Sequence, residues 1–195
     1  DQSNEQDQVI NRMQEMTKAS IRNNFGNRLS VMITGPSGTG KSAIAKQFTK
    51  VMGATLCDDF NPTSSGQNLE ILIKTIKPTK KNPLVISIEE FDKVIEKIHS
   101  GLPEHEYLVI PTIDKPSFNK FMDRISEFDN VFVIFTMNAT FESINILDKS
   151  YIRFGRVDLK VNFGGNTTYN PAEEEVLWVK PFENMSASIN AKRFA

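Results

Sequence analysis

The stretch Gly35-Pro36-Ser37-Gly38-Thr39-Gly40-Lys41-Ser42 fits the pattern G-x-x-x-x-G-K-[ST] of a loop that binds nucleotide phosphates. Its glycines let the backbone turn tightly and bring N–H groups against phosphate oxygens, where a Cβ would intrude. Lys41 would reach the β- and γ-phosphates, and the Ser42 hydroxyl would bind Mg²⁺. This stretch therefore predicts a site for a nucleoside triphosphate with Mg²⁺.

The flanks of this loop supply the strand and the helix that the motif requires. Residues 29–34 form a short run of β type, and residues 42–51 place apolar side chains at helical spacing. The alternative is a flexible Gly/Ser loop that matches by chance. That alternative would make the Lys-Ser pair and both flanks coincidences as well.

Length and composition indicate one α/β domain. The chain has 195 residues, of which 39% are hydrophobic and 24% charged, which is the ordinary range of a globular protein. The net charge of −1 neither implies nor excludes nucleic acid as a partner. The chain begins with Asp1 rather than Met, so we expect a domain taken from a longer protein.

The cellular setting is predicted from the cysteine content and the nucleotide site. The one cysteine, Cys57, cannot form an intrachain disulfide, and a nucleotide site suits a compartment that contains ATP. We therefore expect an intracellular protein. No apolar run approaches the roughly 18 residues of a membrane span, and residues 131–135 instead suit a buried strand.

The alternation of strand and helix patterns predicts a three-layer α/β domain with a mainly parallel, five-stranded sheet. We divide the chain into an N-terminal helix and linker (1–28), a nucleotide-binding core (29–163) and a C-terminal extension (164–195) without a recognisable helical lid. Strands are predicted within 29–34, 54–57, 83–92, 131–138 and 157–163, and helices over 7–22, 42–51, 68–76, 91–98 and 117–128, with a possible short β segment at 107–110.

Polar side chains follow two of these predicted strands. Glu89 and Glu90 end the strand within 83–92, and Asn138 ends the strand within 131–138. Ligands collect at the carboxyl ends of parallel strands, where paired carboxylates can hold Mg²⁺ and activate water, and Asn138 can orient that water. The alternatives are strand-end acids that simply meet solvent, and an asparagine that caps the strand.

Two arginines, Arg153 and Arg156, bracket the glycine turn at Gly155. An arginine supplied across a subunit boundary can stabilise the charge that develops on a transferring phosphoryl group. Surface salt bridges are the alternative, and spacing alone does not decide between the two.

Together these motifs resemble the AAA family of ATPases over residues 29–163. Residues 35–42 resemble its Walker A loop, residues 84–90 its Walker B strand, Asn138 its sensor 1 residue, and residues 152–158 its arginine-finger segment. Within the family the chain looks closest to the mitochondrial Rieske-protein translocase type. Two features depart from the family pattern: Glu89 stands where the family usually has Asp, and no helical lid is evident after the last strand.

The resemblance implies an ATPase that uses ATP and Mg²⁺ in a ring, a hexamer or heptamer, to remodel or translocate a protein or nucleic acid. It further implies that Glu90 polarises the water and that Glu89 helps Ser42 to hold Mg²⁺. By the same analogy Asn138 senses the γ-phosphate, and Arg153 and Arg156 reach the nucleotide of the next subunit.

Two other functions remain open at this level. A superfamily 3 viral helicase has a phosphate loop, an acidic Walker B strand, an Asn-ended strand and a downstream arginine, and its ATPase domain is similarly short. A nucleotide-dependent assembly switch would bind ATP tightly and hydrolyse it slowly.

Overall fold

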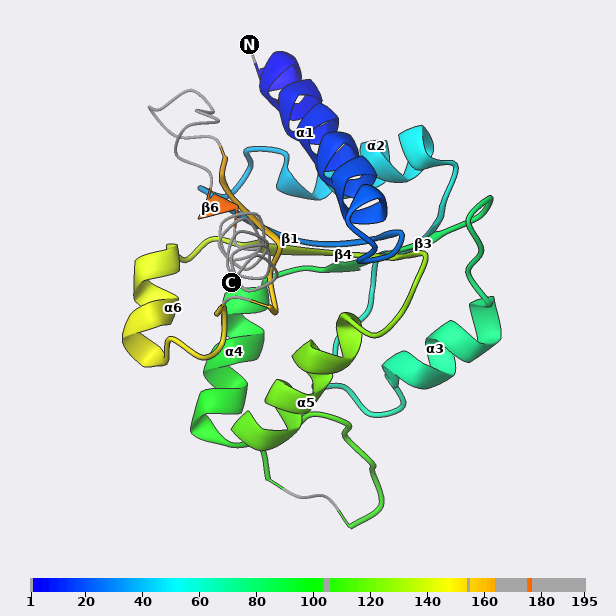
Figure 1. Ribbon diagram of the computed structural model, residues 1–195. Helices are drawn as coiled ribbons and strands as arrows, with labels where there is room; N and C mark the ends of the chain where they lie inside the picture. The colour runs from blue at the N-terminus through cyan, green and yellow to red at the C-terminus, as the bar shows by residue number, and fades with distance from the viewer. Residues whose placement is uncertain (1, 104–105, 154, 164–174, 177–195) are drawn as a thin grey trace, which may run out of the picture.

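The computed structural model describes residues 2–103, 106–153, 155–163 and 175–176 of the chain (Figure 1). Strands and helices alternate along most of it, close to the predicted ranges. The helices are α1 (Gln2–Arg22), α2 (Lys41–Met52), α3 (Leu69–Ile76), α4 (Phe91–Ser100), α5 (Lys115–Ile125) and α6 (Phe141–Leu147). The strands are β1 (Arg28–Thr34), β2 (Thr55–Cys57), β3 (Leu84–Ile88), β4 (Val131–Met137), β5 (Leu159–Asn162) and β6 (Glu175–Val176).

The sheet has the strand order β2-β3-β4-β1-β5-β6. Strands β1 to β5 are all parallel, which confirms the predicted five-stranded parallel sheet. The short strand β6 was not predicted, and it pairs antiparallel with β5 at the edge. Because the five main strands are parallel, the loops after β1, β3 and β4 leave the sheet at the same edge.

Helices cover both faces of the sheet, so the predicted three layers are present. Figure 1 shows α1 and α2 on one face and α3, α4, α5 and α6 on the other. Strand β4 contributes side chains to the hydrophobic clusters on both faces of the sheet. Phe132 and Ile134 join the cluster under α1 and α2, whereas Val133 and Phe135 join the cluster on the opposite face. This two-residue alternation is the ordinary pleat of a strand that is buried on both faces.

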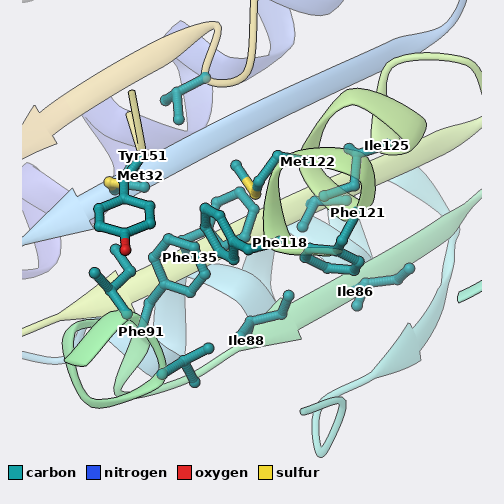
Figure 2. Packing of buried hydrophobic residues seen from close by; sticks show 14 of the residues in the cluster. Met32, Ile86, Ile88, Phe91, Phe118, Phe121, Met122, Ile125, Phe135 and Tyr151 are labelled. Atoms are coloured by element: carbon teal, nitrogen blue, oxygen red, sulfur yellow. The ribbon is translucent and has the colours of Figure 1, made fainter. Parts of the chain in front are cut away.

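The larger core lies between the sheet and helices α4 and α5 (Figure 2). The rings of Phe91 and Phe135 approach to 4.3 Å between centroids, and Phe118 meets Tyr151 edge to face at 5.2 Å. Burial of each such side chain contributes about 1.5–3 kcal/mol to stability. The helix predicted over 117–128 is present as α5, and its residues Phe118, Phe121, Met122 and Ile125 are all buried in this core.

Helix α1 belongs to the same packed body as the nucleotide-binding core. Its residues Val9, Ile10, Met13 and Met16 are buried in the cluster that also holds Phe48 of α2. The predicted boundary at residue 28 therefore divides α1 from a domain with which this helix shares a hydrophobic core. The C-terminal extension (164–195), apart from β6, lies outside the described residues. The prediction that this extension forms no helical lid falls on the same residues.

The β segment predicted at 107–110 is wrong, because these residues belong to an irregular loop between α4 and α5. No strand in the part of the chain that the structure describes pairs with them, and β propensity depends strongly on such a partner. Among the described helices, none is both long and apolar enough to cross a bilayer.

Candidate nucleotide site

A cavity of about 360 Å³ opens at the edge of the sheet where β1, β3 and β4 end. It is lined by the phosphate loop after β1, by the acids after β3 and by the end of β4. The lining residues are Ser37, Gly38, Gly40, Lys41, Ser42, Glu89, Glu90, Thr136, Met137 and Asn138. The structure thus brings most of the predicted loop, both predicted glutamates and the predicted asparagine to one place.

The phosphate loop depends on glycine at two positions with positive φ. Gly38 has φ 80° and Gly40 has φ 82°, a left-handed conformation that other residues rarely adopt. A Cβ at Gly40 would also collide with the side-chain amide of Gln6 from α1, whereas a Cβ at Gly38 would meet no described atom within 4 Å. Helix α2 begins directly after Gly40, so its N-terminal N–H groups face the cavity.

Lys41 is a buried cation folded back onto its own loop. Its Nζ donates hydrogen bonds to the carbonyls of Gly35 at 2.8 Å and Pro36 at 2.7 Å, and to Oδ1 of Asn138 at 3.0 Å. Burial lowers the pKa of Lys41, and the negative charge of Asp92 partly opposes this change. All three acceptors of the ammonium are neutral, so phosphate oxygens could replace them at a net gain in attraction.

The two glutamates after β3 are both exposed, as a ligand-binding role requires. Glu90 is the N-cap residue just before helix α4 and has φ 50°, a conformation that is unusual for a residue with a side chain. Its carboxylate accepts a hydrogen bond from Lys93 Nζ at 2.7 Å, and both side chains are 59% exposed. An ion pair this exposed contributes little to stability, so Glu90 can leave it at small cost.

Asp92 is the site residue that the sequence analysis missed. It lies in the first turn of α4 and is only 8% exposed. Its Oδ2 accepts hydrogen bonds from the backbone N–H of Asn138 at 3.2 Å and of Ala139 at 3.0 Å. A third acid so close after Glu89 and Glu90 is the signal that could have identified it.

The two predicted arginines lie away from the cavity lining, at the side of α5. We call Arg153, Arg156, Asp123 and Asn119 the arginine cluster. Arg156 is 4% exposed, and its guanidinium donates to Asp123 at 2.9 Å, to Asn119 at 2.6 Å and to the Ser150 carbonyl. The Arg153 side chain is 52% exposed and pairs with Asp123 at 3.6 Å. The two arginines, which received the same predicted role from the sequence, therefore differ in the structure: Arg156 is buried and Arg153 is half exposed.

Asp158, which follows the arginines, ties β5 to β1. Its carboxylate accepts hydrogen bonds from the N–H of Ser30 at 2.8 Å and from the Ser30 hydroxyl at 2.9 Å. Burial raises the pKa of Asp158, and the hydrogen bonds from Ser30 and the charge of Arg28 act in the opposite direction. This part of the segment is structural.

The donor set of the cavity fits a triphosphate with Mg²⁺. The Ser42 hydroxyl and the carboxylates of Glu89 and Glu90 are hard oxygen donors, and Mg²⁺ is usually held by one or two carboxylates together with phosphates. Lys41 and the N-terminus of α2 supply the attraction for the phosphates themselves. Glu89 therefore offers the right atom type in place of the expected aspartate.

Comparison with known proteins gives one family. A family model described as "ATPase family associated with various cellular activities (AAA)" matches residues 31–165, which is more than half of the chain. The match supports no subtype within the family and gives no support to a helicase. A search of curated proteins found no match.

Proposed function

Because the chain belongs to the AAA family of ATPases, and so binds and hydrolyses ATP, we propose that its protomers assemble into a ring that remodels or translocates a macromolecule. The observation that carries this proposal is the arrangement of two separate parts. Lys41, Glu90 and Asn138 converge on one cavity. Arg153 lies outside that cavity with a half-exposed side chain, as a residue that serves a neighbouring protomer would.

Within one protomer, we assign binding to the loop and proton transfer to Glu90. The Lys41 ammonium would exchange the carbonyls of Gly35 and Pro36 for phosphate oxygens. Ser42 and Glu89 would hold Mg²⁺, which neutralises charge on the phosphates when it is bound. The Asn138 amide, now bonded to Lys41, would orient toward the γ-phosphate and the attacking water.

The bond changes in this reaction are simple. A water oxygen bonds to the γ-phosphorus, and the bond from that phosphorus to the bridging oxygen breaks to give ADP and phosphate. Glu90 accepts the water proton, which requires its carboxylate to leave Lys93. Positioning and electrostatics supply the rate acceleration.

Between neighbouring protomers, we assign the trans contact to Arg153 and a supporting role to Arg156. Arg153 is exposed enough to reach a second protomer, and its ion pair with Asp123 is long, at 3.6 Å, and half exposed. Arg156 would have to leave three partners in its own protomer, one of them a carboxylate. Arg156 therefore holds the segment from which Arg153 projects.

We propose a polypeptide as the macromolecule. The loop between α4 and α5 presents Tyr107 and Val109 with exposed fractions of 81% and 82%, which suits contact with apolar protein segments. With a net charge of −1, the chain has no general attraction for nucleic acid. A protein cargo also agrees with the resemblance to the Rieske-protein translocase type, which we retain as part of the proposal.

Mixing two inactive variants tests whether sites are shared between protomers. Glu90→Gln keeps Arg153, and Arg153→Ala keeps Glu90, so a mixed ring would contain interfaces with both groups intact. We expect ATP hydrolysis by the mixture to exceed the sum of the separate variants several-fold. Activity equal to that sum would contradict the shared site.

A matched control mixture combines Glu90→Gln with Lys41→Ala. Both changes damage the cavity of the protomer that carries them, so no interface in this mixture has a complete cavity. No recovery of hydrolysis is expected.

Addition of an unfolded polypeptide or of single-stranded RNA to the wild-type protein then identifies the cargo, because the correct polymer should raise the rate of ATP hydrolysis.

A further inference from the structure

The carboxylate of Asp92 lies between helix α4 and the end of β4. One oxygen, Oδ1, accepts a hydrogen bond from the N–H of Lys93 in its own helix at 3.1 Å. The other oxygen, Oδ2, leaves the helix and accepts from the N–H groups of Asn138 at 3.2 Å and Ala139 at 3.0 Å. A simple capping side chain would serve only its own helix.

The segment at Asn138 and Ala139 is held from two sides. Asp92 binds its two N–H groups, while the Thr34 hydroxyl, at the end of β1, donates to the Ala139 carbonyl. These N–H groups follow the last residue of β4, so they need an acceptor beyond the strand pairing. A buried carboxylate in the first turn of a helix is a strong acceptor, because the helix N-terminus stabilises its charge.

This arrangement leads directly to the lysine of the phosphate loop. The backbone of Asn138 is fixed by Asp92, and the Asn138 side chain accepts a hydrogen bond from Lys41 Nζ at 3.0 Å. The contacts therefore run from the first turn of helix α4, through the end of β4, to Lys41. Each step is a hydrogen bond between residues that the structure describes.

We propose that Asp92 is a positioning residue that fixes the backbone at Asn138, and so places the Asn138 amide against Lys41 and the γ-phosphate. The predicted effect of Asp92 on ATP turnover rests on the proposed function. The predicted effect on the backbone of Asn138 in the nucleotide-free protein does not depend on that function, so each of the two predictions can fail without the other.

The first test measures amide hydrogen exchange in the nucleotide-free protein, with NMR as the readout. In Asp92→Ala, we expect the amides of Asn138 and Ala139 to exchange at least about 10-fold faster, because they lose their only described acceptor. Amides in the centre of β4 should not change. The matched control is Glu96→Gln, which removes an exposed acid from the same helix and should leave all of these rates unchanged.

The second test is the steady-state kinetics of the same variants. For Asp92→Ala, kcat should fall by about 10-fold to 100-fold while KM for ATP changes less than about 3-fold, since Asp92 does not line the cavity. In Asp92→Asn, an amide oxygen can still accept from the N–H groups, so part of the kcat should return. A merely structural role would not produce this separation of kcat from KM in a folded variant.

Each outcome bears on the proposal. Wild-type exchange at Asn138 and Ala139 in Asp92→Ala would overturn it, and so would faster exchange with wild-type kcat. If the alanine variant loses its fold, Asp92→Asn decides: wild-type exchange and kcat in that variant would overturn the proposal. If the wild-type protein does not hydrolyse ATP at all, the proposed function fails, and the exchange experiment still tests the positioning.

Discussion

Lys41 in the nucleotide cavity and Arg156 in the arginine cluster are both buried cations, with exposed fractions of 8% and 4%. Their partners differ in kind. Lys41 donates to two backbone carbonyls and one amide oxygen, all neutral, whereas Arg156 donates to the carboxylate of Asp123 as well as to neutral oxygens. A phosphate can improve on the contacts of Lys41, while Arg156 already has a carboxylate. Lys41 can therefore exchange its neutral acceptors for phosphate oxygens, whereas Arg156 stays bound to its partners within the arginine cluster.

The largest effect should come from Lys41→Ala, which removes the cation that binds phosphates. We expect kcat/KM for ATP to fall by about 1,000-fold or more, because a buried charge pair with the phosphates is lost. Lys46→Ala is the matched control, since Lys46 is an exposed lysine on the same helix. Steady-state ATP hydrolysis measures kcat/KM, and binding of a fluorescent ATP analogue measures the affinity. Undiminished binding would place the nucleotide elsewhere.

Glu90→Gln should separate binding from chemistry. The glutamine cannot accept the water proton, so kcat should fall by about 100-fold while ATP affinity stays within a few-fold of wild type. The Glu90 side chain is 59% exposed and forms an equally exposed ion pair with Lys93, so the variant should fold normally. Normal turnover would show that another group activates the water.

The two arginines should separate stability from activity. Arg156→Ala should lower the free energy of unfolding by about 2 kcal/mol, because Asp123 and Asn119 lose a buried partner. Arg153→Ala should change it by less than about 0.5 kcal/mol, since its ion pair is half exposed. Urea denaturation measures both. Equal losses would remove the distinction that we draw between the two residues.

The smallest effect should be a dependence on pH at the start of α5. A hydrogen bond from Lys115, together with bonds from Ser150, lowers the pKa of Asp148. A lowered pKa stabilises the fold above the ordinary aspartate pKa of about 4, and this stabilisation is lost as the pH falls through the folded-state pKa. Lys115→Met should therefore cost about 0.5 kcal/mol at pH 7. The difference from wild type should shrink in urea denaturation below pH 4, and a difference that grew instead would contradict this assignment.

The parts that could be predicted from sequence are those specified by local pattern. The phosphate loop, its flanking strand and helix, and the acids at the end of β3 each follow from residue types at fixed spacing. Parallel strands then bring Glu89, Glu90 and Asn138 to the loop without further information, because their carboxyl ends share one edge.

The parts that could not be predicted depend on tertiary partners. Arg153 and Arg156 look equivalent in sequence, and only the folded structure shows Arg156 buried against Asp123, Asn119 and the Ser150 carbonyl while the Arg153 side chain stays half exposed. Asp92 reads as one more acid near a strand end until the N–H groups of Asn138 and Ala139 are seen beside it. The strand expected at 107–110 failed for the same reason, since β-type residues without a sheet edge remain a loop.

The most direct test of the central claim is ATP hydrolysis per protomer, measured over a wide range of protein concentration with Lys41→Ala as the blank. A cavity that needs an arginine from its neighbour gains activity as protomers assemble. We therefore predict a rate per protomer that rises with concentration and reaches a plateau, with Arg153→Ala remaining low throughout. A rate independent of concentration, with Arg153→Ala as active as wild type, would contradict the account.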